Sequence, residues 1–510
     1  MPELPAASVT TPADPATPHR AERAVLPTGA LRRTSRLLAL PLRHAARAAA
    51  AASRLSGTTT EQVAARSAEQ VFATLGELKG GAAKLGQALS VFEAALPEEV
   101  AKPYRSALSR LTDATPAMPA AVARRVVATD LSLAYGAEWR NRLVDFGDAP
   151  AAAASIGQVH RGRWRDDRGN VVDVAVKVQY PGVAKALRSD LRTAHVLGRV
   201  MARVTGLDIA GLTDELAARM IDELDYVREG RAQSQVAAAF APRVPRALCV
   251  ARAEGVQEPP GRTSVVVPRV YAAMPHVLVT TWLDGTPLTA LLDGGTDSLP
   301  SGWQELARDD AANLAARLIG HAAYAPAACS GWMHADPHPG NFLLLPGRRL
   351  GLLDFGSVAA MPGGPPEPLG QLAAAVLADD GPSALRWARQ AGALAQDAAV
   401  EPGLLIELLH PIVAPTAQDS FTYSPSWLRA LMAHLTQSRF AAVRRELTTP
   451  LEYALIWRGV LSAGGLYAQL GATVPSRAFE MAYSPGFRHA ALSADRHEEP
   501  RRHDYKELRS

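Results

Sequence analysis

Three side chains able to carry chemistry follow one another at short, fixed spacing: His334, Asp336 and Asn341. Thirteen residues after the asparagine, the apolar run Leu350–Leu353 leads into Asp354-Phe355-Gly356. Carboxylate and amide oxygens are the ligands that hard divalent cations such as Mg²⁺ prefer. The pattern therefore requires a fold that brings two polar loops, separated along the chain, to the same cation.

This spacing is typical of the catalytic loop and the metal-binding loop of enzymes that transfer a phosphoryl group from ATP. In that chemistry Asn341 and Asp354 hold Mg²⁺, and Asp336 orients the attacking group or accepts its proton. A different metal site stays open as an alternative, because His334, Asp336 and His338 alternate as ligands on an extended segment would. The wider sequence context favours phosphoryl transfer.

That context begins at residues 174–178, which alternate as a β-strand does and place Lys177 near the strand end. The chain contains only six lysines against 48 arginines, so a lysine at a position that suits a compact phosphate-binding charge is informative. A helical stretch further along offers carboxylates at Glu223, Asp225 and Glu229. They could pair with lysines or remain ordinary solvated helix charges.

No glycine-rich loop precedes the lysine strand, and the sequence contains no Gly-Lys-Ser/Thr phosphate loop. The segment Pro150–His160 is alanine-rich instead. We predict that it forms a turn whose backbone approaches a phosphate, although less freely than glycine would allow.

The order of helix-like and strand-like stretches predicts an α+β fold with a small strand-rich lobe before a mainly helical large lobe. The predicted strands are Gly157–Trp164, Val171–Val178, Val265–Tyr271 and Val277–Trp282. The predicted domains are an N-terminal tail (1–57), a helical extension (58–145), a small lobe (146–284), a large lobe (285–482) and a polar C-terminal tail (483–510).

Positive charge is concentrated in the N-terminal tail. Residues 1–57 hold eight arginines against three acidic residues, a net charge of +5, and the remaining residues sum to −1. A near-neutral body argues against nucleic-acid binding, which requires a cationic face. The arginines of residues 31–55 follow helical spacing, so this segment could lie on an anionic membrane surface or pack on the body with its arginines solvated.

The sequence also bears on location. Two cysteines, Cys249 and Cys329, are too few for a disulfide framework. No uninterrupted run of about 18 apolar residues occurs. We therefore expect a cytoplasmic protein without a transmembrane segment, whose basic tail is the candidate contact with the inner face of a membrane.

Four segments together resemble the UbiB/AarF (ADCK-type) family of atypical protein-kinase-like proteins, over roughly residues 60–480. They are Lys84-Leu85-Gly86-Gln87, the alanine-rich segment 152–160, Glu223-Leu224-Asp225-Tyr226 and the segment His334–Phe342. The resemblance implies a two-lobed protein-kinase-like fold with an N-terminal helical extension. It also implies binding of ATP or ADP with Mg²⁺, and a role in ubiquinone or other isoprenoid-lipid metabolism.

The resemblance assigns roles residue by residue. The extension would fold over the active site as a regulatory element, formed by Lys84 and Gln87 with Glu223 and Asp225. The residues implied in catalysis are Asp336, Lys177 and Glu229, the last two as an ion pair, and those implied in metal binding are Asn341 and Asp354. The residues implied in nucleotide binding are Ala153, Ala154, Ser155, Ile156, Lys177, Val279, Thr281 and Trp282.

Some positions depart from related patterns. Gly230 stands where the family usually has alanine, which should slightly weaken that helix turn. Ala335 replaces the arginine of conventional protein kinases, and a helix is expected to begin near Glu367, which leaves little platform for a peptide substrate. An atypical kinase or ATPase that acts around isoprenoid quinones is therefore the main hypothesis. A nucleotide-gated scaffold or chaperone for a lipid-biosynthetic complex is the alternative.

Overall fold

The computed structural model describes residues 117–154, 156–185, 224–240, 264–295, 297–361, 363–435, 437–448 and 451–498. The predicted N-terminal tail and most of the predicted helical extension lie outside this range. So do four of the predicted site residues, namely Lys84, Gln87, Ser155 and Glu223.

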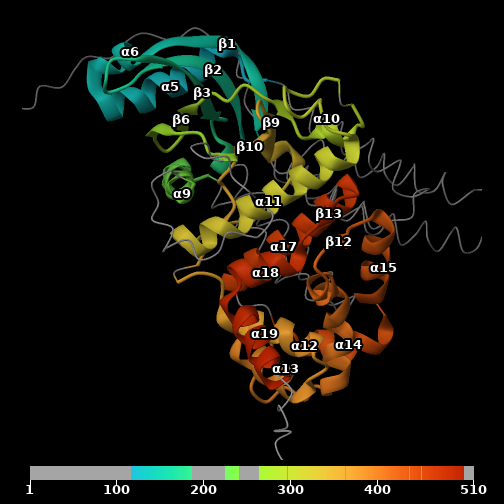
Figure 1. Cartoon of the computed structure of the whole chain (residues 1–510). Helices are drawn as coiled ribbons and strands as arrows, with labels where there is room; N and C mark the ends of the chain where they lie inside the picture. The colour runs from blue at the N-terminus through green and yellow to red at the C-terminus, as the bar shows by residue number, and fades with distance from the viewer. Residues whose placement is uncertain are drawn as a thin grey trace, which may run out of the picture.

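The smaller lobe is built on an antiparallel sheet of five strands (Figure 1). In spatial order they are β1 (Leu143–Ala154), β2 (Gly157–Arg165), β3 (Val171–Gln179), β6 (Val277–Thr281) and β5 (Val270–Ala273). Successive side chains of a strand point to opposite faces, so Val174, Val176 and Val178 are fully buried on one face, against helix α5 (Ala120–Tyr135). Helix α9 (Tyr226–Ala239) packs on β5 and β6 from the other face.

Two expectations for this lobe were wrong. The alanines lie in strand β1 rather than in the turn, because Ala152, Ala153 and Ala154 pair with Val159, Gln158 and Gly157 of β2, and the chain reverses only between Ala154 and Gly157. The predicted strand Val265–Tyr271 is two short strands, since β4 (Val265–Val266) joins a different sheet from β5. Pro268 lies between them and has no backbone N–H to donate to a ladder.

Gly230 illustrates how packing overrides helix propensity. A Cβ atom at this position would lie 2.6 Å from the Cβ of Ala273 and 3.2 Å from Leu278 Cδ1. The missing side chain therefore lets α9 approach β5 and β6 closely, an advantage that propensity alone does not show.

The larger lobe is mainly helical. A four-stranded sheet has the order β4-β10-β9-β7, with β10 (Arg349–Leu352), β9 (Phe342–Leu345) and β7 (Thr286–Pro287). A separate two-stranded sheet pairs β8 (Trp332–His334) with β11 (Val358–Ala360). Its longer helices are α11 (Arg308–Ser330), α12 (Glu367–Leu377), α13 (Gly381–Gln390), α14 (Pro402–Val413), α15 (Pro425–Leu435), α17 (Leu451–Leu470), α18 (Ser476–Tyr483) and α19 (Pro485–Glu498). The predicted helix start at Glu367 is confirmed.

Helix α11 is central to this lobe, because it contacts β8, α17 and α18 as well as α9 of the smaller lobe (Figure 1). The remaining α-helices and strands of the described ranges are α6 (Trp139–Arg142), α10 (Thr289–Leu292), α16 (Ala441–Glu446), β12 (Phe421–Thr422) and β13 (Thr473–Val474). None of the helices in the described ranges combines the length and the apolarity needed to cross a bilayer.

A carboxyl group lies within the aromatic packing between α11, α17 and α18. Burial raises the pKa of Glu480 to about 7, and a hydrogen bond from Ser484 opposes this rise only in part. Glu480 in turn contributes to the raised pKa of Tyr324 and Tyr423 beside it. The fold therefore favours the protonated carboxyl group.

We predict that Glu480→Gln removes a pH-dependent part of the stability. A carboxyl pKa that folding raises contributes stability below pH 4.5, and this contribution is lost as the pH rises through 7. Between pH 5 and pH 8 the free energy of unfolding of the wild type should fall by about 2–3 kcal/mol more than that of Glu480→Gln. Urea unfolding at both pH values, with the exposed Glu446→Gln as control, measures this difference. Equal pH dependence in wild type and Glu480→Gln would contradict the assignment.

Candidate active site

Lys177 and Glu229 form an ion pair between the sheet and helix α9. Lys177 lies on the face of β3 opposite the valine core, and its Nζ donates to both carboxylate oxygens of Glu229, at 2.8 and 3.0 Å. The Glu229 side chain is 2% exposed, and the Nζ also lies 5.0 Å from the ring centroid of Tyr226. Burial alone would lower the pKa of Lys177, but the carboxylates of Asp354 and Glu229 raise it well above its usual value. The ammonium group therefore stays charged.

Asp354 comes to this ion pair from the loop after β10. Its Oδ1 lies 3.8 Å from the Nζ of Lys177 and accepts a hydrogen bond from the backbone N–H of Gly356 at 2.9 Å. The His334 ring donates from Nε2 to the backbone carbonyl of Asp354 at 2.7 Å. Backbone and side chain of Asp354 are thus both fixed, while a third of its side chain stays accessible.

The loop after β8 carries the other two predicted residues. The carbonyl of Asp336 accepts from the Asn341 side-chain Nδ2 at 2.9 Å, across a short 3₁₀ turn, Pro339–Asn341. The backbone N–H of Leu353 donates to the carbonyl of Asn341 at 3.0 Å, so the two loops are joined directly. Because Nδ2 is used in this way, the amide oxygen of Asn341 is the atom that could bind a cation.

The donor set fits Mg²⁺. The Asn341 amide oxygen and the Asp354 carboxylate are hard oxygen ligands, and Mg²⁺ commonly takes one or two such groups from a protein and the rest from phosphates and water. The alternative site is not favoured, because His334, Asp336, His338 and Asp354 do not come together as a group that could hold a metal ion. No cluster of three or more His, Cys, Asp or Glu ligands occurs in the described part of the chain.

Sequence reasoning missed Arg458. This residue lies on α17, 122 positions beyond Asp336, and its Nη2 donates to Asp336 Oδ1 at 2.8 Å. The Asp336 side chain is only 14% exposed. An arginine within a helix carries no local signal, and only the packing of α17 beside the β8–β11 pair places it here.

The predicted nucleotide contacts are placed unequally. Ile156 is buried in a cluster with Tyr226 and Leu278, on the Lys177 side of the sheet. Ala153 is exposed and Ala154 half-buried at the end of β1, two residues from Ile156.

The side chain of Val279 does not face the Lys177 side of the sheet. In the β3–β6 register, Val279 pairs with Val176 and joins the core under α5, whereas Leu278 pairs with Lys177. The backbone N–H groups of Thr281 and Trp282 donate within the lobe, to the carbonyls of Arg269 and Asp173. Adenine contacts along this strand would therefore use other backbone groups.

Asp225 begins helix α9. Its side chain accepts from the backbone N–H of Arg228 at 2.9 Å, which is an N-cap contact. Its implied partner Lys84 lies outside the described residues, as do the other regulatory positions Gln87 and Glu223. By fixing the start of α9, Asp225 also helps to fix Glu229 one turn later.

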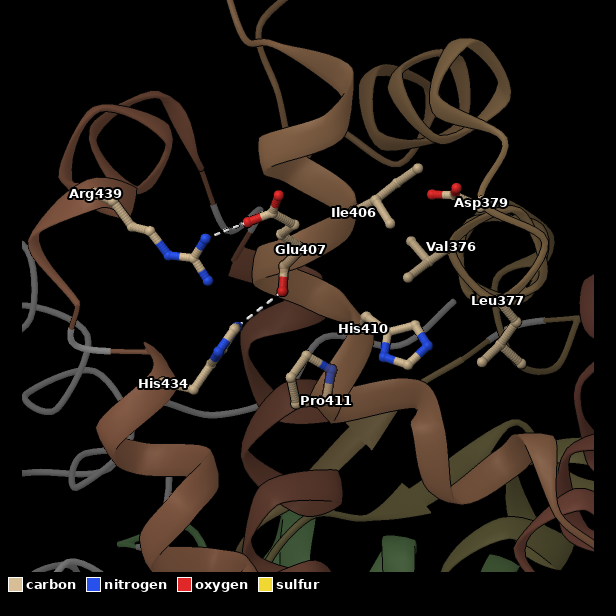
Figure 2. Close-up of a pocket in the computed structure, with 9 residues that line it drawn as sticks. All are labelled: Val376, Leu377, Asp379, Ile406, Glu407, His410, Pro411, His434 and Arg439. Carbon is tan, nitrogen blue, oxygen red and sulfur yellow. Dashed lines mark hydrogen bonds and ion pairs between the residues drawn. The ribbon is translucent and has the colours of Figure 1, made fainter.

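Figure 2 shows a separate cleft of about 600 Å³ on the larger lobe, and no predicted site residue lines it. Pro411 lies within α14 and cannot donate to the carbonyl of Glu407 one turn earlier. His434 of α15 donates to that carbonyl at 2.8 Å, and Arg439 pairs with the Glu407 carboxylate (Figure 2). The polar side chains at this end of the cleft thus provide the hydrogen bond to the Glu407 carbonyl that Pro411 cannot provide.

Comparison with known proteins agrees with this geometry. The chain is 29% identical over 284 residues to Protein Activity of BC1 Complex Kinase 3 (chloroplastic) of Arabidopsis thaliana, covering 55% of this chain and 34% of that protein. It is 34% identical over 169 residues to the mitochondrial atypical kinase coq-8 of Caenorhabditis elegans, covering 33% of this chain and 21% of that protein. The chain thus spans about a third or less of the length of these two relatives.

A solved structure gives a longer match. Rv3197 from Mycobacterium tuberculosis, in complex with erythromycin, is 35% identical, with a TM-score of 0.56 over 83% of this chain and 96% of that one. The sequence profile described as the ABC1 atypical kinase-like domain matches residues 110–384, a range that holds Lys177, Glu229, Asn341 and Asp354. That range is more than half of the 510 residues, and the chain therefore belongs to the ABC1 atypical kinase-like family.

Proposed function

We propose that the chain is an ATP- and Mg²⁺-dependent atypical kinase or ATPase. One observation supports this most strongly: Lys177 bonds to Glu229 and lies 3.8 Å from Asp354, although these residues come from three distant segments. A structural ion pair needs one cation and one carboxylate. A second carboxylate, one-third exposed and next to the same ammonium group, suits a site for phosphates and a metal ion.

Each residue has a role in the proposed reaction. Lys177, held by Glu229, would bind phosphate oxygens, and Asn341 with Asp354 would hold the cation. A cation held by these two residues would supply positive charge that offsets the negative charge developing during transfer. Asp336 would orient the attacking water or hydroxyl group, or accept its proton.

The resemblance of the sequence extends the proposal to partners. The acceptor, where there is one, would be an isoprenoid lipid or a quinone precursor rather than a peptide. The arginine-rich segment 1–57 would attach a cytoplasmic protein to an anionic inner membrane face. The proposal includes no nucleic-acid partner.

Calorimetry and a turnover assay on the purified full chain test the proposal. We expect ATP and ADP to bind only when Mg²⁺ is present, and ATP hydrolysis to respond to vesicles of anionic lipid or to a phenol-like quinone precursor. Tight binding without turnover under every condition would favour a nucleotide-gated scaffold. Well-folded protein that binds no adenine nucleotide would refute both functions.

We predict that Arg458→Gln lowers kcat about 10- to 100-fold, since a hydrogen bond to a charged group contributes about 1.5–3 kcal/mol. Without this donor the Asp336 carboxylate loses one of the contacts that orient it. Arg458→Lys should recover part of the rate, because it restores the charge without the planar fork. Steady-state kinetics, with the exposed Arg429→Gln as control, measure the effect. An unchanged kcat in Arg458→Gln would rule out this role.

A further inference from the structure

Two polar residues occupy core positions on strand β2. Gln158 is 1% exposed and His160 is 0% exposed. They are two positions apart, so their side chains lie on the same face of the strand. Buried polar groups are costly unless they are hydrogen-bonded. Both belong to the alanine-rich sequence segment, yet the proposed reaction uses neither.

The contacts of His160 begin at an irregularity in β1. Between the pairs Phe146–Gly162 and Pro150–His160, β1 has three residues where β2 has one. Gly147 lies in this bulge, and its carbonyl is 2.7 Å from Nδ1 of His160. A carbonyl can only accept, so Nδ1 carries the proton. In the neutral ring, Nε2 is then an acceptor.

Gln158 uses that acceptor and also holds the chain before α5. Its Nε2 lies 2.7 Å from Nε2 of His160 and 3.2 Å from the carbonyl of Met118, and it donates to both. Its Oε1 accepts from the backbone N–H of Met118 at 2.7 Å. One side-chain amide thus satisfies both backbone groups of Met118, as a neighbouring strand would.

This series of bonds connects two places that matter for the proposed site. Met118 lies where the chain enters the described small lobe, just before α5. Gln158 pairs with Ala153 in the β1–β2 hairpin and is two residues from Ile156. We propose that Gln158 and His160 are positioning residues that hold the β1–β2 hairpin in register with the segment entering at Met118, and so set the hairpin's position over the nucleotide. The inference about the nucleotide rests on the proposed function.

The series of hydrogen bonds from Met118 through Gln158 and His160 to Gly147, called the relay below, requires a neutral His160. A proton on its Nε2 would face the donor N–H of Gln158. Rotating the amide would remove that conflict but would turn its NH₂ group toward the N–H of Met118. The nearby charged groups are Asp148 on β1 and Arg124 on α5, which pair with each other at 2.8 Å. Burial lowers the pKa of His160, with the Gly147 contact acting in the opposite direction, which agrees with the neutral ring.

Gln158→Leu tests the relay, with Gln233→Leu as a matched control. Gln233 is another buried glutamine of the small lobe, and it donates to the carbonyl of Pro268 instead. In Gln158→Leu we expect amide exchange of Met118 to be at least about tenfold faster, and the Kd for Mg-ATP to rise about three- to tenfold with kcat within about twofold. Gln233→Leu should change neither. Unchanged Met118 exchange in Gln158→Leu would overturn the relay.

The wild type and a second variant keep the test decisive if Gln158→Leu does not fold. Nitrogen-15 NMR of the histidine-labelled wild type should show His160 as the neutral tautomer protonated at Nδ1 at pH 7. The other tautomer or a charged ring would overturn the proposal. In Gln158→Glu the new carboxylate should favour charged His160, which the same spectra report; a ring that stays neutral at pH 7 in this variant would contradict the contact between the two side chains.

These structural readouts need no nucleotide. If the wild type binds no ATP but Met118 exchange responds as expected, the relay stands and the proposed function fails. If exchange responds and the Kd for Mg-ATP does not, the relay does not position the nucleotide.

Discussion

Asp354→Asn is expected to lower Mg²⁺-dependent ATP turnover by about a hundred- to a thousandfold, because a bound metal ion supplies several kcal/mol of transition-state stabilisation. The asparagine side chain keeps the shape of aspartate and an oxygen that can accept from the Gly356 N–H. It loses the charge that lies 3.8 Å from Lys177 and that would hold the cation. The substitution therefore removes the charge of residue 354 while keeping the hydrogen bond that holds its loop.

Steady-state hydrolysis over a Mg²⁺ titration measures this effect, and thermal unfolding checks that the variant folds. The exposed Asp397→Asn is the matched control and should retain full turnover. Turnover in Asp354→Asn within about fivefold of the wild type would show that this carboxylate does not hold the metal ion, since loss of a metal ligand costs far more.

Glu229→Ala is expected to abolish Mg-ATP binding and to lower the free energy of unfolding by about 3 kcal/mol, since it leaves a buried ammonium group without its main partner. Glu229 provides both oxygens that hold Lys177. Without them, Lys177 should move to Asp354, which is already 3.8 Å away, and should neutralise the carboxylate proposed for the metal ion.

The double variant Lys177→Met, Glu229→Leu distinguishes stability from function. Replacing a buried ion pair by apolar side chains is often neutral or stabilising, so this variant should recover the unfolding free energy that Glu229→Ala loses. It should still bind no nucleotide. Urea unfolding and calorimetry measure the two quantities. Nucleotide binding by the double variant would contradict the proposed role of the ion pair.

The sequence was most informative where the signal is local. Alternation around Lys177 predicted strand β3, and the spacing from His334 to Asp354 predicted two polar loops. In the structure these loops are joined by the hydrogen bonds from the His334 ring to the Asp354 carbonyl and from the Leu353 N–H to the Asn341 carbonyl. Such patterns can be read directly, because strand alternation and loop spacing depend only on residues near one another in the chain.

The sequence did not show how the strands pair with one another. Val279 was implied in nucleotide binding, and its pairing with Val176 turns its side chain into the core under α5. A strand has two faces, and only its register with a neighbour decides which one meets the site. The alanine-rich segment became part of β1 for the same reason, since β2 offers it a ladder.

Gly230 and Arg458 also owe their roles to tertiary contacts that the local sequence does not show. Propensity treats a glycine in a helix as a weakness, but its value here is the close contact of α9 with Ala273. The sequence by itself determined which chemical groups are available and which local elements carry them. Only the tertiary structure decided which groups meet, including Arg458 with Asp336 and Gln158 with Met118. The reason is physical: chemistry and local conformation are properties of neighbouring residues, whereas register and helix packing result from burial shared across the whole fold.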